Sequence, residues 1–243
     1  MKKIILLIFA ISYNSFGQFG NLYKSVIKTY NSPLFSIIEG KFVSTERKSS
    51  IINEKVQKII TGYKFDRSID LQFYYPKTAA DSSCSYFVLN QQKIKITGRF
   101  ENNFACDLDI SSFQVFKGNL GSKKYILLKS INSGSGSFAT TIVFHLFDVT
   151  KKSRVIYYPL WSRYGSINCF GDFDKDGTLD FIKIRNNEKY TGSNTFRANL
   201  MSIDKLHNDF KDIPNTKEWI FERTYTKDSN ISFKTKKTAG RDL

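Results

Sequence analysis

The chain has 243 residues, of which 37 are Lys or Arg and 22 are Asp or Glu, giving a formal net charge of +15 at pH 7. A hydrophobic content of 41% and an aromatic content of 15% exclude a wholly disordered chain and favour β-strands. This length suits one large all-β domain or two small ones, and the basic surface suits acidic partners.

The N-terminus has the pattern of a secretory signal peptide. A basic start is followed by the apolar run Ile4–Ile11, and Ser15 and Gly17 provide the small residues of a cleavage site before Gln18. The apolar run is too short to span a bilayer as a permanent helix. Residues 1–17 are therefore expected to be a signal peptide, and the protein is expected to be secreted or periplasmic.

Residues 18–243 are predicted to form a single all-β domain. Strand-like segments recur along them, marked by period-two alternation or by short apolar runs between turn residues. They lie at residues 34–43, 56–64, 69–75, 85–90, 93–100, 113–117, 124–131, 138–148, 153–158, 166–170, 179–185, 195–203, 218–224 and 230–235. Asp204–Asp212 suggests one short helix. None of these segments is expected to cross a membrane.

Two segments repeat one local pattern. Gly118–Leu128 and Gly171–Phe181 each combine a glycine, a short polar turn and an apolar strand, and a weaker echo begins at Gly62. A spacing of roughly 55 residues suits propeller blades, and the chain has room for about four to five of them. We therefore predict a small β-propeller-like fold, with a β-sandwich that carries one inserted loop as the alternative.

The segment Gly171–Asp180 has the ligand order of a calcium loop between strands. Ca²⁺ takes about six to eight oxygens, and alternating carboxylates of one short segment can fold around it. The predicted ligands are the carboxylates of Asp172, Asp174, Asp176 and Asp180 and the backbone carbonyl of Thr178. Gly177 permits the sharp turn. The loop is not a complete EF-hand, because Lys183 stands where a bidentate Glu belongs and the flanks alternate like strands.

Residues 171–181 resemble the FG-GAP/VCBS repeat in the phrase Gly-Asp-Phe-Asp-Lys-Asp-Gly-Thr-Leu-Asp-Phe. The resemblance implies that the loop joins strands of propeller blades and that its metal is structural. It also implies adhesion or recognition as the general function. It implies nothing more specific, because one fold hosts many functions. A metal that bridges to a ligand is the less favoured alternative.

The cysteines and histidines show no zinc-binding or catalytic spacing. Cys84 and Cys106 flank a predicted hairpin and are the expected disulfide pair in an oxidising compartment. Cys169 is expected to be a buried thiol. His145 has apolar neighbours and is expected to pack or to form a hydrogen bond, whereas His207 lies in a polar stretch and is expected to be exposed.

A glycan-active enzyme would need two carboxylates across a cleft. The candidates are Glu101, Asp107, Asp109 and Asp148, for which a solvated role is favoured. The aromatic runs Phe73–Tyr75 and Tyr157–Trp161 could stack on sugar rings. We expect instead that alternate members fill the core and that the others form cross-strand pairs.

The sequence therefore predicts a non-catalytic binding protein with a structural calcium ion. Its partner is expected to be a protein or an anionic glycan, in the cell envelope or outside the cell. No nucleic-acid motif is present, and export disfavours that partner. Two further hypotheses stay open: an inhibitor or immunity protein against a cell-wall lysozyme, and a glycan-active enzyme.

Overall fold

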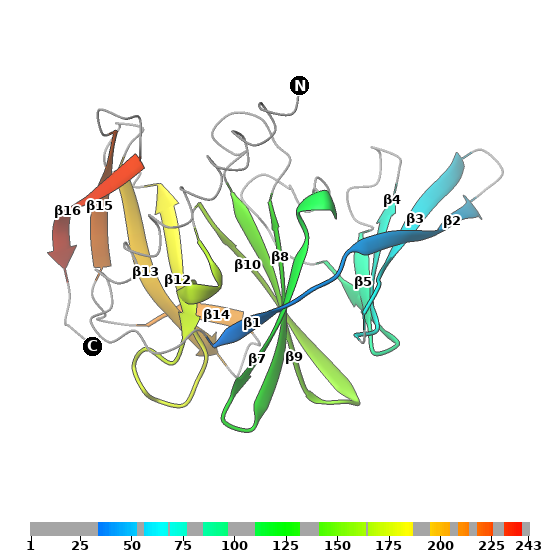
Figure 1. Ribbon diagram of the computed structural model, residues 1–243, viewed down its shortest axis with the longest axis horizontal. Coiled ribbons are helices and arrows are strands. Elements are labelled where there is room, and N and C mark those ends of the chain that lie inside the picture. Colours follow the sequence, from blue (N-terminus) through cyan, green and yellow to red (C-terminus); the bar gives the residue numbers. More distant parts are fainter. Residues whose placement is uncertain are drawn as a thin grey trace. The chain divides into compact units, whose positions relative to one another are not determined.

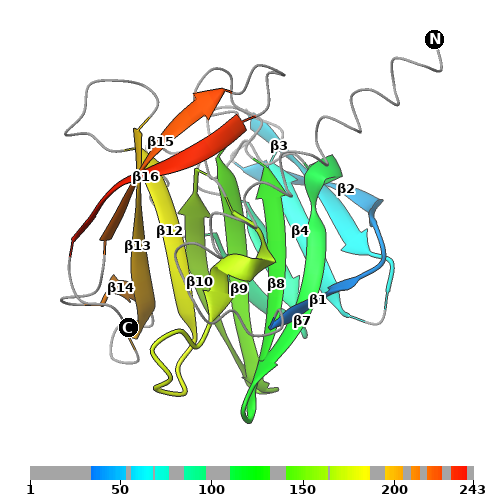
Figure 2. The same cartoon turned by 60° about the vertical axis from the view of Figure 1, so that its left-hand side comes forward.

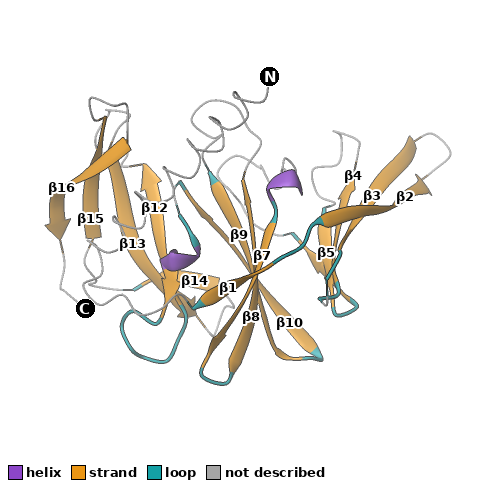
Figure 3. Cartoon of the chain, viewed as in Figure 1, coloured by secondary structure: helices purple, strands orange, loops and turns teal. Residues whose placement is uncertain are grey.

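The computed structural model has an all-β fold, which confirms the predicted fold class (Figure 3). It describes residues 34–52, 56–67, 69–76, 85–96, 110–131, 141–163, 165–186, 195–204, 209–213, 218–225 and 231–239. Within these ranges the helical residues are two single 3₁₀ turns, Ile110–Ser112 and Ile167–Cys169. No helix in the described ranges is long and apolar enough to cross a membrane.

The first sheet is a sequential antiparallel meander, seen in blue and cyan in Figure 1. Its strands are β2 (Phe42–Ile52), β3 (Val56–Phe65), β4 (Leu71–Pro76), β5 (Tyr86–Leu89) and β6 (Gln92–Lys95). Asn90 and Gln91 join β5 to β6, and both have positive φ, at 50° and 64°. Two successive left-handed residues are what a tight two-residue hairpin requires, because their twist matches that of the strands.

The second sheet has the order β1-β7-β8-β9-β10 (Figure 2). Its strands are β1 (Phe35–Ile38), β7 (Gln114–Leu120), β8 (Lys123–Ile131), β9 (Ile142–Lys151) and β10 (Arg154–Ser162). β1 is not the chain neighbour of β7, whereas β7 to β10 follow one another. Gly121 permits the turn from β7 to β8, with a φ of 56°.

The third sheet begins at the calcium-loop motif and has the order β11-β12-β13-β15-β16, with β14 paired to β13. Its strands are β11 (Phe170–Gly171), β12 (Asp180–Asn186), β13 (Thr195–Asp204), β14 (Asp209–Asp212), β15 (Glu218–Tyr225) and β16 (Ile231–Ala239). The printed pairings in this sheet are all antiparallel.

The chain divides into two compact units. The unit Ser36–Trp161 contains the first sheet and nearly all of the second, and the other unit contains the third sheet together with Phe35. The described residues thus form three sheets rather than the expected four to five blades, because each sheet uses five or six strands. They do not show a closed propeller. Gly62, Gly118 and Gly171 lie in β3, β7 and β11, each followed in its sheet by an antiparallel partner.

The core of the unit Ser36–Trp161, which we call the first unit, is rich in aromatic residues. Phe87 of β5 is fully buried, with ring centroids 5.2 Å from Phe73, 5.4 Å from Phe147 and 4.8 Å from the His145 ring. Fully burying a side chain of this kind contributes about 1.5–3 kcal/mol. Because Phe87 comes from the first sheet and Phe147 from β9, these contacts join the two sheets of this unit into one core.

The aromatic run Phe73–Tyr75 forms cross-strand pairs, as the sequence predicted. Phe73 is fully buried opposite Phe87, while the half-buried Tyr74 lies opposite Tyr86 on the other face of the sheet. The two tyrosine rings are stacked with centroids 4.7 Å apart. In this run the alternation therefore places Phe73 in the core and Tyr74 in a cross-strand stack.

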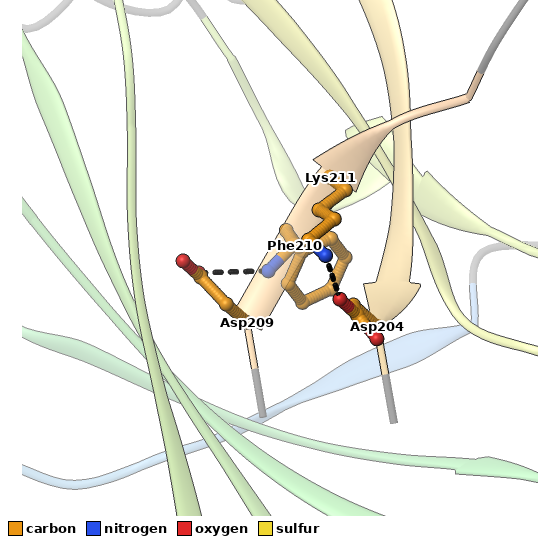
Figure 4. A network of polar contacts seen from close by, with 4 residues as sticks. All are labelled: Asp204, Asp209, Phe210 and Lys211. Atoms are coloured by element: carbon orange, nitrogen blue, oxygen red, sulfur yellow. Dashed lines mark hydrogen bonds and ion pairs between the residues drawn. The ribbon is translucent and has the colours of Figure 1, made fainter. Parts of the chain in front are cut away.

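The predicted helix at Asp204–Asp212 is wrong. Asp204 ends β13, and Asp209–Asp212 form β14, which pairs antiparallel with it. Figure 4 shows the result: Lys211 forms an ion pair with Asp204, and the N–H of Phe210 donates to the Asp209 carboxylate at 2.7 Å. Phe210 is buried opposite Ile203, so tertiary packing outweighs the helical propensity of this polar stretch.

The predicted strand at 166–170 is also shorter than expected. Ser166 begins a 3₁₀ turn, because its side chain accepts a hydrogen bond from the N–H of Asn168 at 3.2 Å. Only Phe170 of that segment belongs to a strand, β11. The thiol of Cys169 is buried, forms no disulfide and donates to the carbonyl of Ser166 at 2.7 Å. Cys169 is therefore a buried thiol, as predicted; Cys84 and Cys106 lie outside the described residues.

His145 lies in the core, as its apolar neighbours predicted, while His207 lies outside the described residues. The His145 ring is fully buried in β9, with Nδ1 2.8 Å from the hydroxyl of Tyr157. Burial lowers the pKa of His145 from 6.5 to about 3. The ring is therefore neutral in the folded protein down to acidic pH.

We predict that His145 makes the fold acid-sensitive. Below pH 6.5 the unfolded chain binds a proton at this ring and the folded chain does not, so the free energy of unfolding falls by up to about 1.4 kcal/mol per pH unit, until the folded pKa is reached. Urea unfolding of wild type and His145→Gln at pH 7.5, 6.5 and 5.5 measures this contribution. Wild type should lose stability faster than the variant below pH 6.5, and a stability difference that stays constant over this range would contradict the prediction.

Candidate calcium site

The aspartate loop connects two antiparallel strands, as the sequence predicted. Phe170 pairs with Phe181 and Gly171 pairs with Asp180, so residues 172–179 form a closed loop between β11 and β12. The rings of Phe170 and Phe181 lie 4.9 Å apart, and Phe35 and Phe210 pack against them at 5.5 and 6.2 Å. The base of the loop therefore rests on an aromatic cluster. Phe35 and Phe210 are distant along the chain, and no local sequence pattern indicates that they belong to this cluster.

Three of the predicted ligands converge. Asp172, Asp174 and Asp176 each offer a carboxylate oxygen, and these three oxygens all lie within 4.8 Å of one another. Asp172 and Asp174 are half-buried, and Asp176 is exposed. Burial raises the pKa of Asp174. The neighbouring carboxylates of Asp176 and Asp172 raise it further, to a smaller extent, because like charges repel.

The same carboxylates organise the loop backbone. Asp172 accepts a hydrogen bond from the N–H of Gly177 at 3.1 Å, Asp174 accepts one from Asp176 at 3.2 Å, and Asp176 accepts one from Thr178 at 2.6 Å. Each of these three hydrogen bonds occupies only one of the two oxygens of its carboxylate. Short side-chain-to-backbone bonds of this kind fix a turn without any helix or sheet partner.

The turn also requires left-handed backbone. Gly177 has a φ of 76°, which explains the glycine at this position. Lys175 has a φ of 63°, a conformation that L-residues with a β-carbon seldom adopt. At Gly171 an added Cβ would lie 2.6 Å from the ring of Phe173, so this glycine allows the aromatic ring to close over the base of the loop.

Asp180 has a different place from the other three aspartates. It is fully buried and is not part of the three-carboxylate cluster. Its Oδ2 accepts hydrogen bonds from the N–H groups of Phe173 at 2.7 Å and Asp174 at 3.4 Å. Burial raises the pKa of Asp180 to about 7, against the opposing effect of hydrogen bonds from Ser202 and these amides.

Two carboxylate oxygens at the loop are buried and lack a hydrogen-bond partner. They are Oδ1 of Asp172 and Oδ1 of Asp180. A buried anionic oxygen without a donor or a cation is costly, by several kcal/mol where the group is charged. An all-oxygen set of carboxylates is what a hard divalent cation such as Ca²⁺ prefers. The residues present therefore fit such an ion.

Thr178, the predicted carbonyl ligand, is buried in the same loop with its N–H held by Asp176. The predicted ligand set is thus divided by the structure into three converging carboxylates, one buried loop residue and one carboxylate that holds the loop backbone. Sequence spacing does not reveal this division, because all four aspartates look alike in the motif.

The structure describes only Asp148 of the alternative carboxylates. Asp148 lies in β9, half-buried, and accepts a hydrogen bond from the N–H of Thr150 at 2.9 Å. Glu101, Asp107 and Asp109 lie outside the described residues. Only one of the four candidates is therefore described, so the structure brings no two of them together.

Comparison of the chain with protein-family models, with curated proteins and with solved structures found no match. The resemblance to the FG-GAP/VCBS repeat accordingly rests on residues 171–181 alone.

We predict that Asp180 stabilises the loop even without metal. Asp180→Ala leaves the N–H groups of Phe173 and Asp174 without their acceptor and should lower the free energy of unfolding by about 1–3 kcal/mol. Asp180→Asn keeps an acceptor oxygen and should lose clearly less. Urea unfolding in EGTA compares the two variants with wild type, and equal stability of all three proteins would rule out this role.

Proposed function

We propose that this protein is an exported, calcium-stabilised binding protein without catalytic activity. The observation that carries the calcium assignment is the pair of buried, unpartnered oxygens of Asp172 and Asp180 beside the converging carboxylates. Asp172, Asp174 and Asp176 would hold the ion, with the Thr178 carbonyl and Asp180 completing its surroundings. A bound Ca²⁺ supplies positive charge that offsets the repulsion within the cluster.

The role proposed for this ion is structural. The loop joins β11 to β12 through the pairs Phe170–Phe181 and Gly171–Asp180, so an ion that fixes the loop also fixes the first hairpin of the third sheet. A rigid β scaffold that presents loops is a common basis for recognition. The signal-peptide pattern of residues 1–17 supports export to the periplasm or the medium.

The proposed partner is an acidic protein or an anionic glycan of the cell envelope or the extracellular space. The support is the excess of 37 basic over 22 acidic residues, which favours association with anionic surfaces. The motif at 171–181 contributes the expectation of adhesion or recognition, through its resemblance to the FG-GAP/VCBS repeat.

We predict that calcium raises the melting temperature of residues 18–243. An ion that binds only the folded state adds about 2.7 kcal/mol at a concentration one hundred times its Kd. Thermal melts in excess Ca²⁺ and in EGTA measure the shift. The double variant Asp174→Ala/Asp176→Ala should lose it.

A matched control is available in β14. Asp209 and Asp212 are exposed in the same unit, so Asp209→Ala/Asp212→Ala makes the same change in net charge outside residues 172–179. This control should keep the full calcium shift. If wild type and the Asp174→Ala/Asp176→Ala variant respond equally to calcium, the assignment of the site is wrong.

The proposed recognition of an anionic glycan has a separate test. At an ionic strength of about 0.15 M, where the Debye length is about 8 Å, long-range attraction is largely screened. The calcium-loaded protein should be retained on heparin-agarose under these conditions and should pass through unmodified agarose. Passage through both matrices would remove the glycan as a partner and leave an acidic protein.

A further inference from the structure

The aspartate loop contains a dipeptide that is open to a reaction within the chain itself. Asp176–Gly177 is the only place in the 243 residues where an aspartate or an asparagine precedes a glycine. Glycine has no β-carbon that would shield its backbone nitrogen from the side chain of the preceding residue. The nitrogen of Gly177 can therefore attack the side-chain carboxyl of Asp176 more readily than the corresponding groups elsewhere in the chain.

The structure leaves this dipeptide accessible. Asp176 and Gly177 are both exposed, and a Cβ added at Gly177 would meet no atom of the described residues within 4 Å. The carboxylate of Asp176 accepts a hydrogen bond from the N–H of Thr178 at 2.6 Å, so it lies across the peptide group that Asp176 shares with Gly177. The two groups that would react are thus held close together within one short turn.

Two hydrogen bonds restrain the reaction in the closed loop. The N–H of Gly177 donates to Asp172 at 3.1 Å, and the carboxylate of Asp176 is held by Thr178. Both bonds lie between β11 and β12, in a turn outside the sheet ladder. Exposed segments of this kind open locally at a small cost in free energy. The attack therefore requires an opening of the loop and no unfolding of the sheet.

We propose that Asp176 is a site of spontaneous modification to isoaspartate, and that a cation bound in the loop suppresses this reaction. The reaction itself rests on the sequence and geometry of the dipeptide, whereas the protective role of the cation rests on the proposed function. An ion that binds only the closed loop reduces the open fraction, and at a concentration about one hundred times its Kd it reduces that fraction about one-hundredfold. The rate of modification should fall by the same factor.

The reaction exchanges bonds and needs only solvent water. The carboxylate of Asp176 takes a proton from solvent, and the nitrogen of Gly177 then attacks its Cγ. A C–N bond forms, and the amide hydrogen leaves with the carboxyl hydroxyl as water, which gives a succinimide ring. Water adds to one of the two ring carbonyls and breaks its bond to the nitrogen. When the main-chain carbonyl opens, the chain continues through Cβ and Cγ, and the product is isoaspartate.

Isoaspartate cannot take the place of Asp176 in the carboxylate cluster. The main chain gains one carbon at this residue, and the free carboxylate moves to Cα, one bond closer to the backbone. The oxygens of Asp172, Asp174 and Asp176 converge to within 4.8 Å of one another only with the normal side chain in place. The modified protein should therefore lose its calcium-dependent melting shift.

The test incubates residues 18–243 at neutral pH for days, in EGTA and in excess Ca²⁺, below the melting transition. Peptide mapping, combined with an enzymatic assay that methylates only isoaspartate, measures the product at each aspartate. In EGTA the product should accumulate at Asp176 ahead of the other aspartates, and in Ca²⁺ it should accumulate far more slowly. The proposal is overturned if Asp176 stays unmodified in EGTA, or if a protein that shows the calcium melting shift is modified equally fast in both media. Absence of the melting shift would instead overturn the calcium assignment and with it the protective role, while the reaction in EGTA is measured independently.

Two substitutions at the same position assign the product. Asp176→Glu keeps the carboxylate and the net charge but would have to close a larger ring, which forms much more slowly, so the product should disappear. Asp176→Asn loses ammonia without first taking a proton, so its ring should form several-fold faster than that of wild type in EGTA. Wild-type amounts of isoaspartate in Asp176→Glu would place the reaction at another residue and overturn the proposal.

Discussion

The buried carboxylate of Asp180 is the constraint on which the aspartate loop depends. Asp180 begins β12, pairs with Gly171 across the base of the loop and stands opposite Ser202 of β13. A fully buried carboxylate is costly unless its oxygens are satisfied. Its Oδ2 is satisfied by two loop amides, which draws the loop backbone toward the sheet. The position of the loop therefore follows from the pairing of the strands.

The first unit depends on a different constraint, which is the alternation of large aromatic residues. Each sheet is made mostly of strands that follow one another along the chain, so most pairings form between near neighbours. Such meanders leave one face apolar, and Phe73, Phe87 and Phe147 show how the faces of the two sheets meet. His145 sits in this core as a neutral ring because its hydrogen bond to Tyr157 satisfies one nitrogen without a charge.

Much of this fold was predictable because its signals are local. Period-two alternation located most of the strands, and the motif located the loop with its glycine at positive φ. The errors at 166–170 and 204–212 arose because neither outcome depends on the periodicity of the segment. One capping serine decides the first, and the pairing of β14 with β13 decides the second.

Register was the part of the site that the sequence could not supply. The motif treats Asp172 and Asp180 as equivalent ligands, whereas the pairing of β11 with β12 buries one of them in the sheet. The opposition of Arg185 and Arg197 is likewise invisible until the strands are aligned, because a shift of one residue would place them on opposite faces.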